Sequence, residues 1–298
     1  MKYNVIGLSE LKVSEIGFGC MSLSKASLTD AATMIKSAVD VGINFFDTAD
    51  LYDKGANEEL VGTVLKPVRN NILLATKVGN EWRRDGSGWD WNPKKAYIVK
   101  AVEDSLRRLQ TDYIDLYQLH GGTIEDAMED TIEAFEELVR QGKIRYYGIS
   151  SIRPNVIRKY VELSSIQSVM MQYSLLDRRP EEEMITYLEE NHKSILVRGA
   201  LAQGLLVNKP AKDYLGYGED EVSLLQDHLA QNSEKETRRI AIALQYVLGK
   251  PVVASAVIGF RTVEQLKEVL QNDTDTIDQQ ALEDAHKVLV PKKYEAHR

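Results

Sequence analysis

The chain has 298 residues, of which 43% are hydrophobic and 28% charged, a composition ordinary for a globular protein with a sizeable core. Its formal net charge of −8 argues against nucleic acid or an anionic membrane as the main partner, although it leaves room for a local basic pocket that binds phosphate. The single cysteine, Cys20, excludes an intrachain disulfide and favours a reducing, cytoplasmic setting. We expect no signal peptide because the first residues lack a long apolar segment, and no membrane span because no apolar run approaches roughly 18 residues.

Short apolar runs typical of strands alternate along the chain with segments of helical periodicity. Strands are predicted at 16–20, 43–46, 72–76, 114–119, 143–149, 166–171, 194–197 and 255–258. The helices that follow them are predicted at 29–41, 57–66, 93–109, 124–140, from 154 onward, and at 180–190, 235–248 and 263–270. Strands that alternate with helices imply parallel pairing, and eight such units over about 250 residues match a (β/α)8 TIM barrel in size.

Four segments lie outside this alternation. Residues 2–13 read as a small β-hairpin that closes the bottom of the barrel, and residues 279–290 read as an extra C-terminal helix. A long loop over 79–92 holds three tryptophans, and a Gly- and acid-containing stretch over 207–232 shows no clear period. Because no composition shift divides the chain, we expect a single domain over residues 1–298.

Titratable side chains follow three of the predicted strands. The second strand runs into Asp47, with Tyr52 shortly after it, the third runs into Lys77, and the fourth runs into His120. Taken one at a time, these residues are better explained as a turn cap, a rim aromatic, a surface lysine and a core histidine. Because the carboxyl ends of barrel strands share one face, where the chemistry of such enzymes lies, we expect them to form one site.

The four side chains suit the protonation of an oxygen that gains negative charge, as in carbonyl reduction. A free tyrosine is a weak acid, with a pKa of about 10, and a neighbouring ammonium favours its phenolate. Lys77 could supply that charge to Tyr52, and Asp47 could hold Lys77 through a charge-assisted hydrogen bond. His120 could donate a hydrogen bond to the substrate oxygen.

These motifs, taken in order along nearly the whole chain, resemble the aldo-keto reductase superfamily, in particular the bacterial general-stress or inositol-operon type of reductase. The segments that carry the resemblance are Asp47-Thr48-Ala49-Asp50-Leu51-Tyr52, Asn57-Glu58-Glu59, Ala75-Thr76-Lys77, residues 112–120, Tyr147-Gly148-Ile149-Ser150, Gln172-Tyr173-Ser174, residues 201–206 and Ile258-Gly259-Phe260-Arg261. The resemblance implies a (β/α)8 barrel that reduces aldehydes and ketones with NADPH. It also implies that Asp47, Tyr52, Lys77 and His120 are the catalytic residues, with Tyr52 as the acid.

The resemblance further implies a set of cofactor-binding positions: Gly19, Cys20, Met21, Ser150, Gln172, Arg198, Gly199, Leu201, Gln203, Gly204, Gly259, Arg261, Gln265 and Glu268. Backbone N–H groups at a helix start together with Arg261 form a natural phosphate site, which by family position takes the 2′-phosphate of NADP. Arg198 stands where many members have a tyrosine that stacks on the nicotinamide, and a planar guanidinium can also stack or bind phosphate. Ser151 and Val269 each replace a common asparagine.

The substrate pocket is expected to involve the loop that follows Lys77. Trp82, Trp89 and Trp91 read either as hydrophobic plugs on the barrel rim or as walls of the pocket, and the sequence leaves both interpretations open. Asp53 replaces the glycine that usually follows the family's catalytic tyrosine, and at the pocket mouth it would disfavour anionic substrates. Cys20 reads as a packing residue because no partner base is apparent, and no metal site is predicted.

Two alternatives remain at this stage. The chain could be an NADPH-binding sensor of the same fold with little turnover, or a barrel lyase in which Lys77 forms a Schiff base. The phosphate-binding segment around Arg261 weighs against the lyase, and the complete set of four catalytic residues weighs against the sensor.

Overall fold

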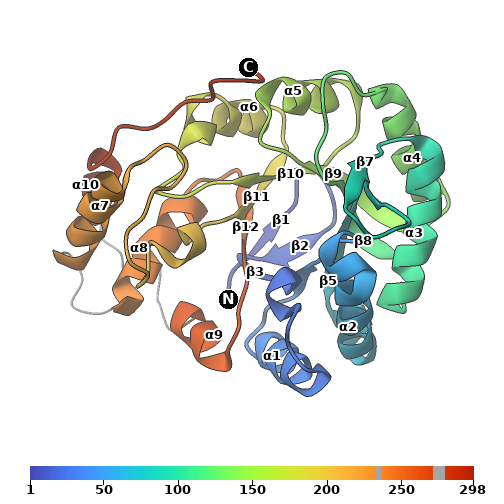
Figure 1. Cartoon of the computed structure of the whole chain (residues 1–298), viewed down its shortest axis with the longest axis horizontal. Helices are drawn as coiled ribbons and strands as arrows, with labels where there is room; N and C mark the ends of the chain where they lie inside the picture. The colour runs from blue at the N-terminus through green and yellow to red at the C-terminus, as the bar shows by residue number, and fades with distance from the viewer. Residues whose placement is uncertain (232–235, 271–278) are drawn as a thin grey trace.

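A computed structural model of the chain describes residues 1–231, 236–270 and 279–298, in which eight parallel strands close into a barrel surrounded by helices (Figure 1). The barrel strands are β3 (Ile16–Gly19), β4 (Phe45–Asp47), β5 (Leu73–Val78), β8 (Ile114–Leu119), β9 (Ile144–Ser150), β10 (Ser168–Gln172), β11 (Ser194–Arg198) and β12 (Val253–Ile258). Each pairs with the next in this order, and β12 closes the ring on β3. The predicted (β/α)8 TIM barrel is therefore confirmed.

Helices follow the barrel strands and cover the outside of the ring (Figure 1). They are α1 (Leu28–Asp40), α2 (Ala56–Leu65), α3 (Lys95–Leu109), α4 (Met128–Arg140), α5 (Pro154–Leu163), α6 (Met184–Glu190), α7 (Glu219–Gln231), α8 (Glu236–Leu248), α9 (Val263–Leu270) and α10 (Gln279–Lys287). Within the described residues, none of them combines the length and the apolar character that a membrane crossing requires.

Helix boundaries differ from the predicted ones where side chains bond the backbone locally. The helix expected from residue 124 begins only at Met128, because the Asp126 carboxylate accepts hydrogen bonds from the backbone N–H and the hydroxyl of Thr123 and holds a turn there. The helix expected over 180–190 divides into a 3₁₀ turn and α6. The helix that contains α8 is predicted to start at Lys235, and this residue lies outside the described residues.

The N-terminal hairpin, β1 (Tyr3–Val5) paired with β2 (Lys12–Ser14), plugs one end of the barrel, as predicted. Its Ile6, Leu11 and Val13 are fully buried and pack with Phe45 and other inward-facing strand residues in an inner core. Figure 1 shows the hairpin lying across the middle of the ring of strands. The plug explains why chemistry can occur only at the other end, where the strands finish.

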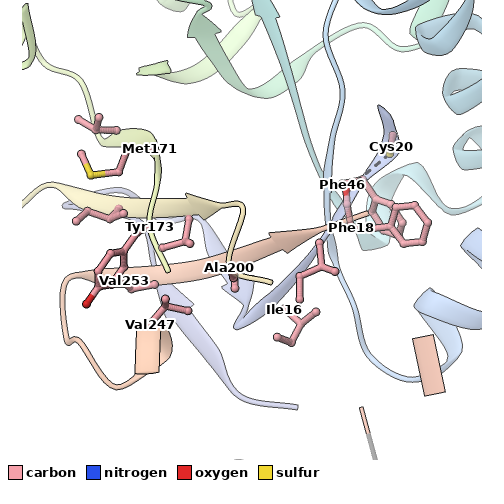
Figure 2. Packing of buried hydrophobic residues seen from close by; sticks show 14 of the residues in the cluster. Ile16, Phe18, Cys20, Phe46, Met171, Tyr173, Ala200, Val247 and Val253 are labelled. Carbon is pink, nitrogen blue, oxygen red and sulfur yellow. Dashed lines mark hydrogen bonds between the residues drawn. The ribbon is translucent and has the colours of Figure 1, made fainter. Parts of the chain in front are cut away.

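Side chains on alternate strand positions face outward and form a second core beneath the helices. Phe46, next to the inward-facing Phe45, stacks on Phe18 with ring centroids 5.7 Å apart (Figure 2). Cys20 lies beside this pair in Figure 2 and is fully buried. Burial on both faces explains why the barrel strands read as continuous apolar runs rather than alternating ones.

Both aperiodic stretches contain regular structure, so the prediction of a plain loop over 79–92 is wrong. Strands β6 (Asn80–Trp82) and β7 (Trp89–Trp91) form an antiparallel hairpin that follows the end of the barrel strand β5. Its strands are only three residues long, which is too short for a pattern of alternating residues to predict a strand. The stretch over 207–232 contains a tight turn at residues 214–217 and then α7.

Candidate active site at the ends of the barrel strands

Strand register brings the polar strand-end residues together. Asp47 is the last residue of β4, Lys77 lies next to the end of β5, and His120 directly follows β8. Lys77 is the register partner of Gln118 across β5 and β8. Gln118 was not identified from the sequence, although its place two residues before His120 puts it on the same face of the strand.

A buried ion pair lies at the centre of this group. The Lys77 Nζ is 2.6 Å from Asp47 Oδ2, and the two side chains are 1% and 6% exposed. Lys77 also donates to the Thr48 carbonyl at 2.7 Å, and Gln118 donates to Asp47 Oδ1 at 3.2 Å. Burial opposes the charged amine, but Asp47 and then Tyr52 more than offset it, so the pKa of Lys77 is raised. Lys77 is therefore held as an ammonium.

Tyr52 begins a 3₁₀ turn, Tyr52–Gly55, directly above this pair. The Lys77 Nζ lies 5.2 Å from the centre of the phenol ring, and the His120 ring meets it edge-on with centroids 6.0 Å apart. The two residues after Tyr52 adopt left-handed backbone, with φ of 50° at Asp53 and 56° at Lys54. Such strain in non-glycine residues persists only where surrounding structure imposes it, and it is typical of functional sites.

His120 is a neutral imidazole in this environment. Burial first, and then the positive charges of Lys77 and Arg198, lower its pKa to about 3. Its Nδ1 is buried without a hydrogen-bond partner. A neutral imidazole carries one N–H donor and one acceptor nitrogen, so His120 can hydrogen-bond an oxygen without presenting a positive charge.

The three tryptophans take different positions. Trp82 is half-buried against the turn that carries Tyr52: its Nε1 donates to the Leu51 carbonyl at 3.2 Å, and Lys54 Nζ lies 5.1 Å from its ring. Trp89 is 48% exposed. Trp82 therefore contacts the residue next to Tyr52, while Asp53 is exposed on the same turn.

Trp91 instead supports the backbone behind the site. Its ring lies so close to Gly79 and Gly121 that a Cβ on either glycine would approach it to 2.7 and 3.1 Å, respectively. Its Nε1 donates to Asp126 at 2.9 Å. Because these glycines follow the segments that carry Lys77 and His120, Trp91 braces both strand ends.

One group of predicted cofactor residues meets at the ends of β9, β10 and β11. Ser150, Gln172 and Arg198 are the last residues of these strands. Gln172 Oε1 accepts a hydrogen bond from Arg198 Nη1 at 2.8 Å, and its Nε2 donates to the Tyr214 hydroxyl at 2.8 Å. Tyr214 lies in the aperiodic stretch, where no sequence signal pointed to it.

A second group lies between the end of β12 and the loop after β11. At the end of β12, a Cβ on Gly259 would lie 3.1 Å from the Cβ of Ser22. In the loop after β11, four residues have positive φ: Gly199 (73°), Ala202 (46°), Gln203 (58°) and Gly204 (95°). The backbone of this loop is bonded internally, since the N–H groups of Ala202 and Gly204 donate to the Gly199 and Leu201 carbonyls, both at 2.8 Å. Arg261 is exposed just before α9, and its backbone N–H donates to Gln265 Oε1 at 2.9 Å.

Cys20 lies buried next to the ion pair. Burial first, and then Asp47, raise the pKa of the Cys20 thiol well above its ordinary value, which suits the predicted packing role. Across residues 1–231, 236–270 and 279–298, no group of three or more His, Cys, Asp or Glu side chains is arranged to hold a metal ion.

Comparisons with known proteins find relatives along nearly the whole chain. The sequence model of the Aldo/keto reductase family matches residues 15–288. The chain is 49% identical to the uncharacterized oxidoreductase YqkF of Bacillus subtilis over 287 residues, which cover 91% of this chain and 90% of the relative. It is 30% identical to the aldo-keto reductase YhdN of the same organism, over 97% of this chain and 94% of the relative. The holo form of the aldo-keto reductase AKR11C1 from Bacillus halodurans superposes with a TM-score of 0.94 at 49% identity, over 100% of this chain and 99% of that one, and its apo form superposes with 0.86.

Proposed function

The chain belongs to the aldo/keto reductase family and is an oxidoreductase, and from this premise we propose that it reduces aldehydes and ketones to alcohols with NADPH, using Tyr52 as the general acid. The observation that carries the proposal is the buried Lys77–Asp47 pair directly beneath the phenol ring. The core does not need this ion pair for its stability, because replacing a buried ion pair with apolar residues is often neutral or stabilising.

The four side chains divide the work of a proton transfer. NADPH, when bound, supplies a hydride to the carbonyl carbon. Tyr52 gives its proton to the carbonyl oxygen, and the Lys77 ammonium stabilises the negative charge that develops on the phenol oxygen as the proton leaves. Asp47, with Gln118 on its second oxygen, keeps Lys77 charged and in place. Neutral His120 donates a hydrogen bond that orients the carbonyl oxygen.

The residues around the rim support a nicotinamide dinucleotide as cofactor. Gln172 offers an amide at the strand ends. Gly259 lets two backbone segments approach closely, because a Cβ there would lie 3.1 Å from the Ser22 Cβ. The chain superposes on the holo form of AKR11C1 with a higher TM-score than on its apo form, and a holo form implies a bound cofactor in that relative.

The Schiff-base alternative is disfavoured by the state of Lys77. A lysine that attacks a carbonyl must lose its proton, and enzymes achieve this by lowering the amine's pKa. In this site the pKa of Lys77 is raised, and its ammonium bonds both Asp47 and the Thr48 carbonyl. The sensor alternative shares the whole site and differs only in turnover.

The test is NADPH oxidation against a panel of aldehydes and ketones, with Tyr52→Phe as the variant and Tyr3→Phe as a matched control. Tyr3 donates its hydroxyl to the Gly42 carbonyl at the opposite end of the barrel, so its loss should leave turnover unchanged. Tyr52→Phe should lower kcat by about 100-fold or more, as expected for loss of a general acid, and should leave the Kd for NADPH unchanged.

Three results would contradict parts of the proposal. Full activity in Tyr52→Phe would show that Tyr52 is not the acid. Stoichiometric NADPH binding without turnover on any carbonyl would favour the sensor. Equal use of NADH and NADPH, unaffected by Arg261→Ala, would remove the phosphate role given to Arg261.

A further inference from the structure

We propose that Tyr214 is a positioning residue for the nicotinamide end of the cofactor: together with Arg198 it fixes the orientation of the Gln172 side-chain amide. The inference rests on the proposed function, because it assumes that NADPH binds at these strand ends. It assigns a role to a residue from the aperiodic stretch over 207–232, which neither motif nor periodicity connects to the site.

The three side chains form a chain of hydrogen bonds. Arg198 Nη1 donates to Gln172 Oε1 at 2.8 Å, and Gln172 Nε2 donates to the Tyr214 hydroxyl at 2.8 Å. Gly199 packs alongside, where a Cβ would lie 3.2 Å from Gln172 Cγ. Gln172 is thus bonded on both ends of its amide and packed from the side.

Donor and acceptor chemistry gives this chain one direction. A guanidinium can only donate, so the oxygen of the Gln172 amide must face Arg198 and its nitrogen must face Tyr214. The Tyr214 hydroxyl completes the arrangement by accepting from that nitrogen. Each end of the amide then keeps unused capacity, one lone pair on Oε1 and one N–H on Nε2, which is the pair of groups that a carboxamide can bond.

Tyr214 can serve as a fixed point because its own backbone is rigid. It begins a two-residue turn in which Leu215 and Gly216 both have positive φ, of 49° and 86°, and Tyr214 and Tyr217 exchange backbone hydrogen bonds at 2.9 and 3.0 Å. Tyr214 is only 7% exposed. The turn is tied to the C-terminal segment, since the Tyr217 hydroxyl donates to the Val290 carbonyl at 3.1 Å.

A Tyr214→Phe variant removes the acceptor and keeps the ring. The bond it breaks lies between neutral groups, so the Kd for NADPH should rise by about 3- to 10-fold, which corresponds to the net free energy of one hydrogen bond. The Kd for 2′-phospho-ADP-ribose, which lacks the nicotinamide, should not change. A variant that only loosened the fold would weaken both ligands together.

The experiment measures both dissociation constants by isothermal titration calorimetry for wild type, Tyr214→Phe, Gln172→Ala and the double variant. Tyr3→Phe is the matched control, because it removes a tyrosine hydroxyl that bonds the Gly42 carbonyl at the opposite end of the barrel. In the Gln172→Ala background, Tyr214→Phe should have no further effect on the NADPH Kd, since the group it positions is gone.

Three outcomes overturn the inference: an unchanged NADPH Kd in Tyr214→Phe, an equal loss for both ligands, or effects of Tyr214→Phe and Gln172→Ala that add. If Tyr214→Phe fails to fold, NMR of the side-chain amides in NADPH-free wild type tests the hydrogen bond instead. The Gln172 Nε2 protons should be protected from exchange with solvent, and unprotected exchange would refute the bond to Tyr214. If wild type binds neither ligand, the proposed function fails, which is distinct from these results.

Discussion

Removing the Lys77 amine while leaving Asp47 in place is the most informative perturbation of the site. In wild type the two groups are 2.6 Å apart and almost fully buried. Lys77→Met keeps the length of the side chain but leaves Asp47 with Gln118 as its remaining side-chain partner. Breaking a buried pair from one side costs about 3–5 kcal/mol, because the remaining carboxylate is buried without a counter-charge. We expect the free energy of unfolding to fall by this amount.

The loss should depend on pH in a definite direction. Burial already raises the Asp47 pKa in wild type, and loss of the Lys77 ammonium, which lowers it, raises it further. A carboxyl group with a raised folded pKa loses stability as pH rises above about 4, the pKa of an unfolded Asp carboxyl. The variant has the higher folded pKa, so its deficit should grow with pH, by at most about 1.4 kcal/mol per pH unit. Lys77→Met with Asp47→Asn leaves no buried charge and should recover much of the loss.

Urea unfolding followed by circular dichroism and tryptophan fluorescence measures these differences, using conditions in which the two transitions coincide. Lys36→Met is the matched control, since it breaks an ion pair with Asp40 whose side chains are 75% and 58% exposed. It should cost less than about 1 kcal/mol. If the double variant is as unstable as Lys77→Met, or if the deficit does not grow with pH, the buried-charge reasoning is refuted.

Three further predictions follow from individual residues. His120, with its pKa lowered to about 3, should show no imidazole titration by NMR between about pH 5 and about pH 8, and a midpoint near 6.5 would contradict its neutral state. Burial, and then Glu58, raise the pKa of Asp50 well above 3.8. As pH rises from 3.8, the stability of Asp50→Asn relative to wild type should therefore increase by up to about 1.4 kcal/mol per pH unit. Urea titrations measure this difference, and a difference that does not depend on pH would refute the prediction. Gly79→Ala places a Cβ 2.7 Å from the Trp91 ring, at a φ of +124°. Its control is Gly142→Ala, where a Cβ meets nothing within 4 Å and only backbone strain of roughly 1–2 kcal/mol is expected. Gly79→Ala should lower the free energy of unfolding by more than the control does, and equal losses would show that Trp91 is not a brace.

The alternation of apolar runs and helical segments was enough to predict the barrel and the shared location of Asp47, Lys77 and His120. The reason is geometric: parallel strands that close into a barrel all end on the same face, so residues at the carboxyl ends of different strands become neighbours. The N-terminal hairpin was also predictable, because its apolar residues flank a turn signal. The place of Tyr52 was less predictable, since it lies on a turn beyond its strand and that turn sets its position over Lys77.

The tertiary structure alone decided the charge state of the site and the contacts between distant loops. His120 is neutral because burial combines with positive charges from β5 and β11, and a linear pattern contains neither the burial nor those distances. The bond from Gln172 to Tyr214 joins segments 42 positions apart, one of them without periodicity. The hairpin that bears the tryptophans is likewise held by Trp91 against Gly79 and Gly121. Local patterns determine which residues reach the rim, whereas desolvation and contacts between loops determine what those residues do there.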